Sequence, residues 1–290
     1  MKQKRFNSFL ETTFASAVLA TVLLALPGTS YATPPTEIST CTTINTSGSY
    51  KLVADLFFAP GTADLPSLST CITINASNVD LKLNGHTITG PAAADGTAGI
   101  SVTGQTNVDI RGPGVISNFG RGIEFIGVTF SEVRGASVDR NFFGFAVLQD
   151  SNGNLFRGNT SNGNVSTAFT LNGASNNDLI NNTADDNGTF GILLFSGTGN
   201  QVKGNTTNGN ALEGILAGGG TAAGHTIKNN NASNNGLFGI RVPFGSTGNT
   251  VTGNTAQSNH FIDLADDNDA CDNNTWAHNV FNTSRGTCIQ

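Results

Sequence analysis

Five basic side chains recur at almost constant spacing in the middle of the 290-residue sequence. We call these five residues the basic row; its first three members are arginines and its last two are lysines. One position of the same spacing, Ile180, carries no charge. Arg binds carboxylates through paired hydrogen bonds, so a line of such cations suits a polyanionic chain, such as a polysaccharide that contains uronic acids. The alternative is a solvated face whose cations serve solubility. The members of the basic row are Arg111, Arg134, Arg157, Lys203 and Lys228.

Three aspartates are candidates for acid–base chemistry beside this row. Asp139 and Asp185 lie two repeats apart, and Asp186 follows directly. If successive repeats stack at the spacing of β-strands, Asp139 and Asp185 are separated by about 10 Å. Inverting glycosidases space their two carboxylates almost this widely, to leave room for an attacking water, and Asp186 could share a proton with Asp185. The structural alternative is that these aspartates form turns.

A second acidic cluster lies near the end of the sequence. Carboxylate oxygens at this density could hold Ca²⁺, and calcium is the one cofactor that the sequence leaves open. The cluster lacks EF-hand spacing, and the alternative is an exposed acidic capping loop. No ligand set for another metal can be assigned. The members of this cluster are Asp263, Asp266, Asp267, Asp269 and Asp272.

Asparagines reveal the repeat that must position these side chains. In a first column they recur at intervals of 23, 23, 25, 24 and 25 residues, with an apolar residue three positions before each. A second column lies five residues further along and extends upstream to Asn141 and Asn118, and a third column is partial. The columns are Asn159, Asn182, Asn205, Asn230, Asn254 and Asn279; Asn164, Asn187, Asn210, Asn235 and Asn259; and Asn154, Asn177, Asn200, Asn249 and Asn274.

Short segments of alternating apolar residues stand between these Asn/Gly turns, as at Ile192 and Leu194 and again at Ile262 and Leu264. Such alternation predicts β-strands rather than helices. A repeat of 22–25 residues with two or three short strands is typical of one coil of a β-solenoid. Identical side chains in stacked coils lie about 4.8 Å apart, and an amide can donate and accept hydrogen bonds along such a stack. We therefore expect the asparagine columns to be structural, with sugar binding as the alternative.

The segment Val79–Gly90, VDLKLNGHTITG, resembles the entry coil of secreted β-helix proteins of the pectin-lyase-like superfamily. The later G-N-x-x-x-x-N…G-I-x-L pattern is similar to NosD-type repeats. The resemblance covers about residues 38–290 and implies an all-β fold, a single-domain right-handed parallel β-helix of about ten coils. Because related folds host lyases, hydrolases, epimerases and binding proteins, it does not imply an activity.

Motifs of the catalytic relatives are mostly missing. Of the ordered N-T-D, D-D, G-H-G and R-I-K motifs of polygalacturonase-like hydrolases, only D-D has counterparts, at Asp185–Asp186 and Asp266–Asp267. No G-H-G or R-I-K follows, and the D-P-H-E signature of mannuronan epimerases is absent. No catalytic motif can therefore be assigned.

Residues 1–32 have the pattern of a secretory signal peptide, with a basic head, an apolar stretch from Phe14 to Leu26 and a small-residue cleavage site that ends at Ala32. The apolar stretch is too short to span a bilayer. We expect residues 33–290 to form one β-helix domain, with an N-terminal cap and entry coils at 33–95, regular coils at 96–262 and a C-terminal cap at 263–290. Four cysteines in an exported chain favour two disulfides, and their places near the two ends favour the pairs Cys41–Cys71 and Cys271–Cys288.

Without residues 1–32, 11 Lys and Arg stand against 19 Asp and Glu, and so acidic a chain is a poor partner for nucleic acid. We expect a monomeric periplasmic or extracellular protein, with no membrane span, that interacts with carbohydrate, specifically an acidic polysaccharide. The alternative is a polysaccharide lyase or glycoside hydrolase that acts on a uronate-containing polymer through the basic row and Asp139, Asp185 and Asp186. A structural or adhesin-like surface protein is a further alternative.

Overall fold

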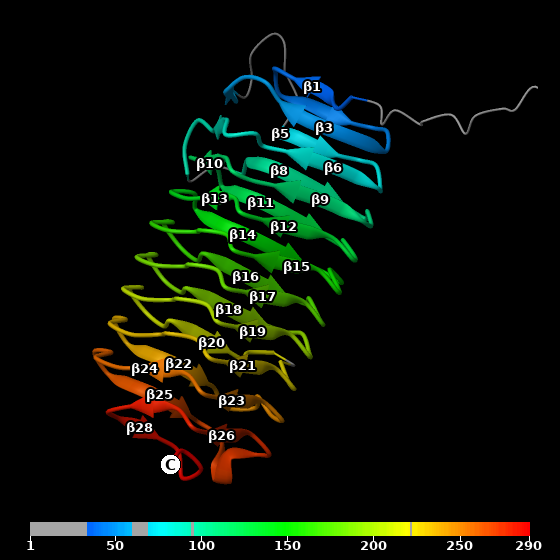
Figure 1. Ribbon diagram of the computed structural model, residues 1–290. Helices are drawn as coiled ribbons and strands as arrows, with labels where there is room; N and C mark the ends of the chain where they lie inside the picture. Colours follow the sequence, from blue (N-terminus) through cyan, green and yellow to red (C-terminus); the bar gives the residue numbers. More distant parts are fainter. Residues whose placement is uncertain (1–33, 60–68, 94–95, 221) are drawn as a thin grey trace, which may run out of the picture. The chain divides into compact units, whose positions relative to one another are not determined.

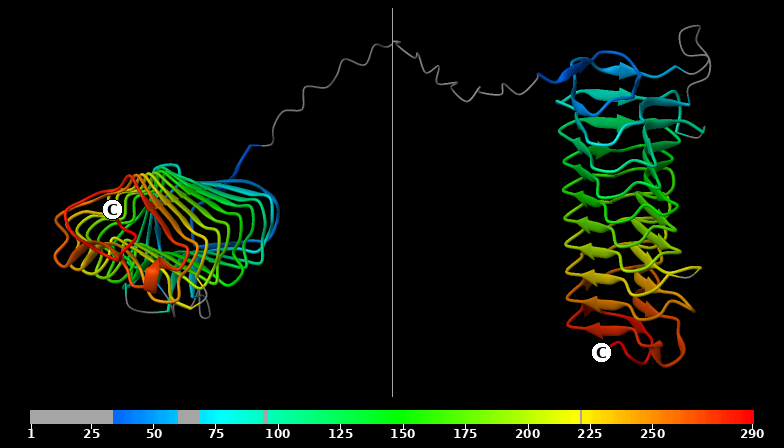
Figure 2. Two further views of the ribbon diagram at one scale, coloured as in Figure 1. Left: turned by 90° about the horizontal axis from the view of Figure 1, so that it is seen from below. Right: turned by 90° about the vertical axis from the view of Figure 1, so that its right-hand side faces the viewer.

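The chain from residue 34 onward is a parallel β-solenoid, as the sequence predicts (Figure 1). The computed structural model describes residues 34–59, 69–93, 96–220 and 222–290, and the predicted signal peptide lies outside these residues. Within them, the strands stack into two parallel sheets of eleven strands each and a third sheet of four. From β3 onward, each coil passes from the first sheet along the side of the third sheet to the second sheet, and returns to the first one step further along (Figure 2). Eleven strands in each main sheet agree with the expectation of about ten coils.

The strands are short, and most of them have three to six residues. The first sheet contains β1 (Thr36–Ile38), β3 (Gly48–Leu52), β6 (Val79–Lys82), β9 (Val108–Arg111), β12 (Glu132–Arg134), β15 (Leu155–Arg157), β17 (Asp178–Ile180), β19 (Gln201–Lys203), β21 (Thr226–Lys228), β23 (Thr250–Thr252) and β26 (Thr275–Ala277). The second contains β2 (Thr42–Ile44), β5 (Thr70–Ile74), β8 (Ala98–Thr103), β11 (Arg121–Ile126), β14 (Phe143–Leu148), β16 (Phe169–Asn172), β18 (Ile192–Phe195), β20 (Ile215–Ala217), β22 (Phe238–Val242), β25 (Ile262–Asp266) and β28 (Ser284–Arg285). The third contains β4 (Leu56–Phe57), β7 (Thr87–Thr89), β10 (Val115–Ser117) and β13 (Ser137–Val138); β24 (Thr255–Ala256) pairs with β27 (Val280–Phe281), and η1 (Asp269–Cys271) is a single 3₁₀ turn.

Apolar columns run the length of the solenoid and form its core. On the first sheet, one inward column pairs in register from strand to strand, and each member is at most 7% exposed. Its members are Ile110, Val133, Phe156, Leu179, Val202, Ile227, Val251 and Trp276. The second sheet adds two more inward columns, in which the rings of Phe145 and Phe169 stack with their centroids 4.4 Å apart. Burial of each large apolar side chain contributes about 1.5–3 kcal/mol, so the columns hold successive coils together.

The three asparagine columns are buried hydrogen-bond ladders, one at each corner of the coil. In the first column, Oδ1 of Asn182 accepts the backbone N–H of Asn159 at 3.0 Å and its side-chain amide at 3.1 Å. The amide of Asn182 in turn donates to the carbonyl of Phe156 at 2.9 Å and to Oδ1 of Asn205 at 3.0 Å. Asn182 is 1% exposed. Polar backbone groups that a tight corner would leave unpaired thus find a partner in the next coil, and the predicted structural role is confirmed.

A residue with left-handed backbone conformation directly precedes almost every ladder asparagine. At the first column, Gly158, Asn181 and Gly204 hold φ angles of 59°, 54° and 67°. Glycine and asparagine adopt this conformation at the least cost. The recurring Gly-Asn and Asn-Asn pairs therefore have a physical reason, because the first residue turns the chain and the second joins the ladder.

Two ladders end in buried carboxylates near the C-terminus. Oδ1 of Asp263 accepts the backbone N–H and the amide of Asn259, at 3.0 and 2.8 Å. Oδ2 of Asp266 accepts the amide of Asn274 at 3.1 Å and the indole N–H of Trp276 at 2.8 Å. Burial alone would raise the pKa of Asp263, but the hydrogen bonds from Asn259 and two further backbone N–H groups outweigh it and hold the pKa below its usual value.

Two details of the predicted register are wrong. The second asparagine column begins at Asn141, one coil later than expected, because Phe119 takes the ladder position of the coil before and Asn118 takes the left-handed position that precedes it. In β25, the inward pair consists of Leu264 and Asp266 rather than Ile262 and Leu264. A carboxylate can replace an apolar residue there because protein donors surround it.

His225 fills the gap that the sequence leaves in the third column. Its Nδ1 accepts the backbone N–H of Asn200 at 3.2 Å, and its own backbone N–H donates to Oδ1 of Asn249 at 2.9 Å. The residue is 1% exposed, and among the described residues Nε2 has no hydrogen-bond partner. Burial lowers the pKa of His225 to about 4. The ring is therefore neutral at pH 7, with its proton on Nε2 and Nδ1 free to accept.

Both predicted disulfides form. Cys41 and Cys71 join adjacent strands at the N-terminal end of the second sheet, with their Cα atoms 4.5 Å apart. Cys271 and Cys288 fasten the C-terminal tail to η1, with their Cα atoms 6.0 Å apart. No helix among the described residues is long and apolar enough to cross a membrane.

Asn182→Ala is expected to lower the free energy of unfolding by about 3 kcal/mol, because it leaves the amide of Asn159 and the carbonyl of Phe156 buried without partners. Urea denaturation followed by circular dichroism measures this loss. The control is Asn162→Ala, since the half-buried Asn162 side chain accepts only the backbone N–H of Asp185 and its removal should cost about 1 kcal/mol. Equal losses of unfolding free energy in the two variants would contradict a larger stabilising contribution from the ladder asparagine.

Stability is expected to fall as the pH drops from about 6.5 to about 4, because His225 takes up a proton more readily in the unfolded chain than in the fold. The whole loss is roughly 3 kcal/mol and is complete below the folded pKa. His225→Asn should restore the ladder, raise the unfolding midpoint and flatten this part of the pH profile. Urea midpoints at several pH values test this, with His260→Asn at an exposed site as the control. A profile that keeps its slope in His225→Asn would rule out this residue as the source.

Candidate functional site

The basic row lies on the outward face of the first sheet. Strand pairing aligns, as successive Cα partners, Lys51, Lys82, Arg111, Arg134, Arg157, Ile180, Lys203 and Lys228. Lys51 and Lys82 do not stand out in the sequence, because the coils that join Lys51 to Lys82 and Lys82 to Arg111 are 31 and 29 residues long and break the period. A signal was present nonetheless, since Lys82 directly follows a buried leucine just as Arg111 directly follows a buried isoleucine.

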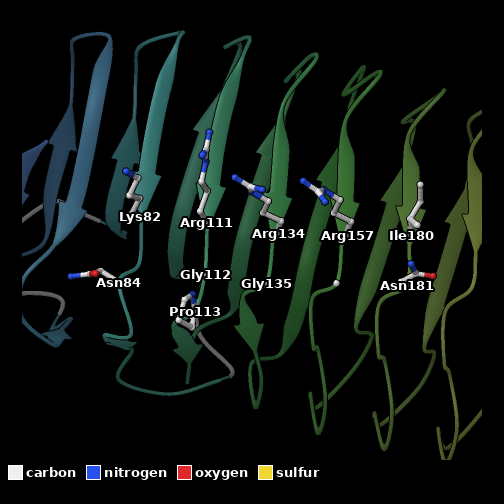
Figure 3. A pocket seen from close by; sticks show the side chains of 11 residues that line it. Lys82, Asn84, Arg111, Gly112, Pro113, Arg134, Gly135, Arg157, Ile180 and Asn181 are labelled. Atoms are coloured by element: carbon white, nitrogen blue, oxygen red, sulfur yellow. The ribbon is translucent and has the colours of Figure 1, made fainter. Parts of the chain in front are cut away.

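A groove of about 720 Å³ lies along this row, at the corner that leads to the third sheet. Figure 3 shows Lys82, Arg111, Arg134, Arg157 and Ile180 in one line on successive strands, with the residues of the following turn beside them. The lining contains no carboxylate, histidine or tyrosine. It consists of Lys82, Asn84, Arg111, Gly112, Pro113, Arg134, Gly135, Arg157, Gly158, Ile180 and Asn181.

Two glycines keep the middle of the groove open. Gly135 and Gly158 have left-handed backbone conformations, with φ of 63° and 59°. A Cβ atom built on either would meet nothing within 4 Å, so a side chain there would extend into free space. Because these glycines have no side chains, a ligand can approach the backbone between the cations and the turn.

A row of acidic residues runs parallel to the cations, two residues earlier on each strand. Its members are Asp80, Asp109, Glu132 and Asp178. Nε of Arg111 lies 2.9 Å from Oδ1 of Asp80, and its Nη2 lies 2.6 Å from Oδ2 of Asp109. The hydrogen bond to Asp109 raises the pKa of Arg111 above its usual value, against the opposing effect of burial. Arg111 is thus held in place by protein carboxylates on both sides.

Charge compensation is incomplete along the rest of the row. Glu132 is shared, in contact with Nε of Arg157 and 3.9 Å from Nε of Arg134. Among the described residues, three lysines of the row form no ion pair; they are Lys82, Lys203 and Lys228. The row therefore keeps a net positive charge that an external anion can meet.

Two of the predicted catalytic aspartates lie after the third sheet, outside the groove. Oδ1 of Asp139 accepts the backbone N–H of Asn162 at 2.7 Å, and its Oδ2 accepts the hydroxyl of Ser137. Oδ1 of Asp185 accepts the backbone N–H of Asn208 at 2.7 Å. The two aspartates are two coils apart, but neither lines the groove with Arg134 and Arg157. The structure does not bring the predicted acids and the predicted cations together.

Asp186 is the left-handed corner residue that precedes ladder residue Asn187, with φ of 58°. Burial raises the pKa of Asp185, the hydrogen bond from Asn208 opposes this, and the charge of Asp186 adds to it. In the coil before, Asn162 takes the same turn position as Asp185 and accepts the N–H of Asp185 at 2.8 Å. Asparagine and aspartate therefore alternate in one structural role here.

The C-terminal aspartates do not converge on one site. Asp263 and Asp266 are buried as ladder ends, and Asp267 lies 2.8 Å from Nη2 of Arg241. Within the described chain, the one grouping of three ligand-type residues is Asp266 with the two sulfurs of the C-terminal disulfide. The remaining two members are exposed and are Asp269 and Asp272. Calcium binding at this end stays a prediction to which this arrangement adds no support.

Comparison with known proteins places the chain among solenoids of this kind. Residues 70–225, more than half of the chain, match the family described as "Right handed beta helix region". The chain belongs to the right-handed β-helix family. A search of curated proteins by sequence finds no match.

Solved structures share the fold of this β-helix at low sequence identity. The alginate lyase from Paenibacillus sp. str. FPU-7 superposes with a TM-score of 0.63 at 15% identity, covering 87% of this chain and 99% of the lyase. The Dettilon tailspike protein gives 0.60 at 15% identity, over 86% of this chain but only 54% of the tailspike. The A-module of the Azotobacter vinelandii mannuronan C-5 epimerase AlgE4 gives 0.57 at 16% identity, over 83% of this chain and 78% of the module. Identity this low establishes the fold alone.

Asp185→Asn is expected to change the free energy of unfolding by less than about 0.5 kcal/mol, because the amide oxygen can still accept the N–H of Asn208. Asp185→Ala removes that acceptor and should cost about 1 kcal/mol. Urea denaturation of both variants at neutral pH measures the difference. If the asparagine variant were as unstable as the alanine variant, the turn role assigned to Asp185 would fail.

Proposed function

We propose that this β-helix is an exported protein that binds an acidic polysaccharide along the basic row without cleaving it. The observation that carries the proposal is the groove beside Lys82, Arg111, Arg134 and Arg157, which offers cations and backbone but no acid–base pair. Two disulfides support the exported location, because such bonds persist in oxidising compartments.

The spacing of the cations suits a linear polyanion. Successive members of the row lie on neighbouring strands, about 4.8 Å apart. A polysaccharide that runs parallel to the solenoid axis therefore meets a new cation at each coil. Arg134 and Arg157 can hold carboxylates through paired hydrogen bonds, and the unpaired Lys203 and Lys228 extend the positive surface beyond Ile180.

Two of the structurally similar proteins are named for work on alginate or mannuronan, which are polymers of uronic acids. The fold that they share with this chain supports an acidic polysaccharide as the ligand class. A monomer is sufficient for this role, because one chain supplies the whole row.

The alternative of a hydrolase or lyase stays a prediction with weaker support. Inverting glycosidases flank the scissile bond with two carboxylates, whereas Asp139 and Asp185 lie outside the groove lining and accept backbone N–H groups of the next coil. A structural or adhesin-like role would need no groove at all, so the groove favours binding.

The double variant Arg134→Ala/Arg157→Ala is expected to bind alginate oligosaccharides about tenfold or more weakly at low salt, because it removes two charge-assisted contacts. Isothermal titration calorimetry at two salt concentrations measures the affinity and its salt dependence, which should also diminish. Arg121→Ala is the matched control, since Arg121 has similar exposure but lies on the second sheet.

Reducing-end and unsaturated-uronate assays on the same samples should stay at background. Product formation by the wild-type protein would replace the binding proposal with the enzymatic alternative. Equal affinity of the wild-type protein and the double variant would remove the basic row from the site.

A further inference from the structure

The groove changes its chemical character at β17, where the basic row is interrupted. Strand pairing places Ile180 between Arg157 and Lys203, in register with both. Every other residue aligned at this position, from Lys51 to Lys228, is a cation. Ile180 lies on the outward face and lines the groove, so its apolar side chain does not contribute to the core. Ile180 is therefore a candidate for contact with the ligand.

The same strand carries a carboxylate without a partner on its outward face. Asp178 lies two residues before Ile180, at the position that Asp80, Asp109 and Glu132 occupy on earlier strands. Each of those three acids contacts an arginine of the basic row. Within the described part of the chain, the carboxylate of Asp178 forms no ion pair or hydrogen bond. Burial raises the pKa of Asp178, and no donor or cation opposes this effect.

Asn181 adds an amide at this end of the groove (Figure 3). In the three coils before, the same corner position holds a glycine, at Gly112, Gly135 and Gly158. Oδ1 of Asn181 lies 2.3 Å from the place where a Cβ atom would stand on Gly204 of the next coil. Its side chain is exposed and has no hydrogen-bond partner among the described residues. Both the donor and the acceptor of this amide are therefore available to a ligand.

We propose that the groove at β17 holds an uncharged sugar unit between acidic ones, so that the ligand is a heteropolysaccharide rather than a homopolymer of uronic acids. The inference rests on the proposed function, because it specifies the ligand of the same groove. A neutral sugar offers a C–H face to an apolar side chain and hydroxyl groups to an amide or a carboxylate. Ile180, Asn181 and Asp178 supply these three groups, and we call them the neutral subsite.

Electrostatics disfavours a uronate at the neutral subsite. A ligand carboxylate opposite Ile180 would lack the charge-assisted pair that an arginine provides, and it would face the like charge of Asp178. Binding sites commonly exclude a wrong ligand by such repulsion. In the coils on either side, Arg157 and Lys203 can each pair with a carboxylate. Because coils lie about 4.8 Å apart, neighbouring sugar units of an extended chain can face these positions in turn, in the order uronate, neutral sugar, uronate.

The test compares two hexasaccharides by isothermal titration calorimetry at about 0.15 M salt. Every unit of the alginate hexasaccharide is a uronate, whereas in the hyaluronan hexasaccharide a uronate alternates with a neutral N-acetylated sugar. The wild-type protein is expected to bind hyaluronan about tenfold more tightly than alginate. Ile180→Arg completes the basic row, so it should tighten alginate binding about fivefold and weaken hyaluronan binding by a similar factor. Asp178→Asn removes the like charge but keeps an acceptor, so it should tighten alginate binding about threefold and leave hyaluronan binding unchanged.

Thr252→Arg is the matched control, because Thr252 pairs in register with Lys228 and adds the same charge beyond the groove. It should leave the ratio of the two affinities unchanged, and urea midpoints check that each variant is folded. The neutral subsite is overturned if the wild-type protein binds alginate at least as tightly as hyaluronan, or if Ile180→Arg leaves the ratio as Thr252→Arg does. Either result leaves the groove as a binding site. Absence of binding by both hexasaccharides would overturn the proposed function as well.

Discussion

The hydrogen bond from one coil to the asparagine of the next is the interaction on which this solenoid depends. A coil of about 23 residues must turn sharply three times, and each turn leaves backbone groups with no partner in its own coil. At the first column, Asn182 accepts two hydrogen bonds from the coil before and donates to a carbonyl of that coil and to the amide oxygen of the coil after. Buried polar groups are tolerated only when paired, so the ladder makes tight corners compatible with an apolar core.

Neither the packing of the core nor the hydrogen bonding of the corners constrains the residues at the outward positions of the sheets. Apolar columns occupy the inward positions, and the ladders with their left-handed partners occupy the corners. A substitution at an outward position such as Arg134 disturbs neither the apolar columns nor the ladders. Because the coils stack in register, a residue type that recurs at this position in successive coils forms a regularly spaced row. The basic row and the open glycines beside it show this most clearly. A row of like residues on the outward face does not affect the packing of the core, and it produces an extended surface.

The fold was predictable from the sequence because its main determinants repeat at a fixed interval. The roles of residues that deviate from the repeat could not be predicted in this way. His225 breaks an asparagine column yet accepts the same hydrogen bond through Nδ1, an equivalence that only the geometry reveals. Lys51 and Lys82 belong to the basic row but lie in longer coils, and Asp266 replaces an inward apolar residue because donors from Asn274 and Trp276 meet it.

The candidate site was predictable only in part. The alignment of the cations follows from strand pairing, which a constant period predicts. The relation of Asp139 and Asp185 to the cations depends on which corner each occupies, and spacing along the sequence carries no information about the direction of a side chain after a turn. Their hydrogen bonds to backbone N–H groups show that a column of aspartate and asparagine can arise from turn chemistry alone.

The ladders also give the solenoid an electrical polarity. Most ladder amides, such as those of Asn159 and Asn182, donate to Oδ1 of the C-terminal neighbour, so their dipoles add along the axis as peptide dipoles do in a helix, with the positive end toward the C-terminal coils. Asp263 and Asp266 stand at that end, where a buried negative charge is stabilised by the aligned dipoles as well as by individual hydrogen bonds. A second chain that tried to continue the stack would find the donors of these two columns already taken by carboxylates. The last coil is thus closed by electrostatics as well as by its disulfide, which protects an otherwise exposed sheet edge from end-to-end growth.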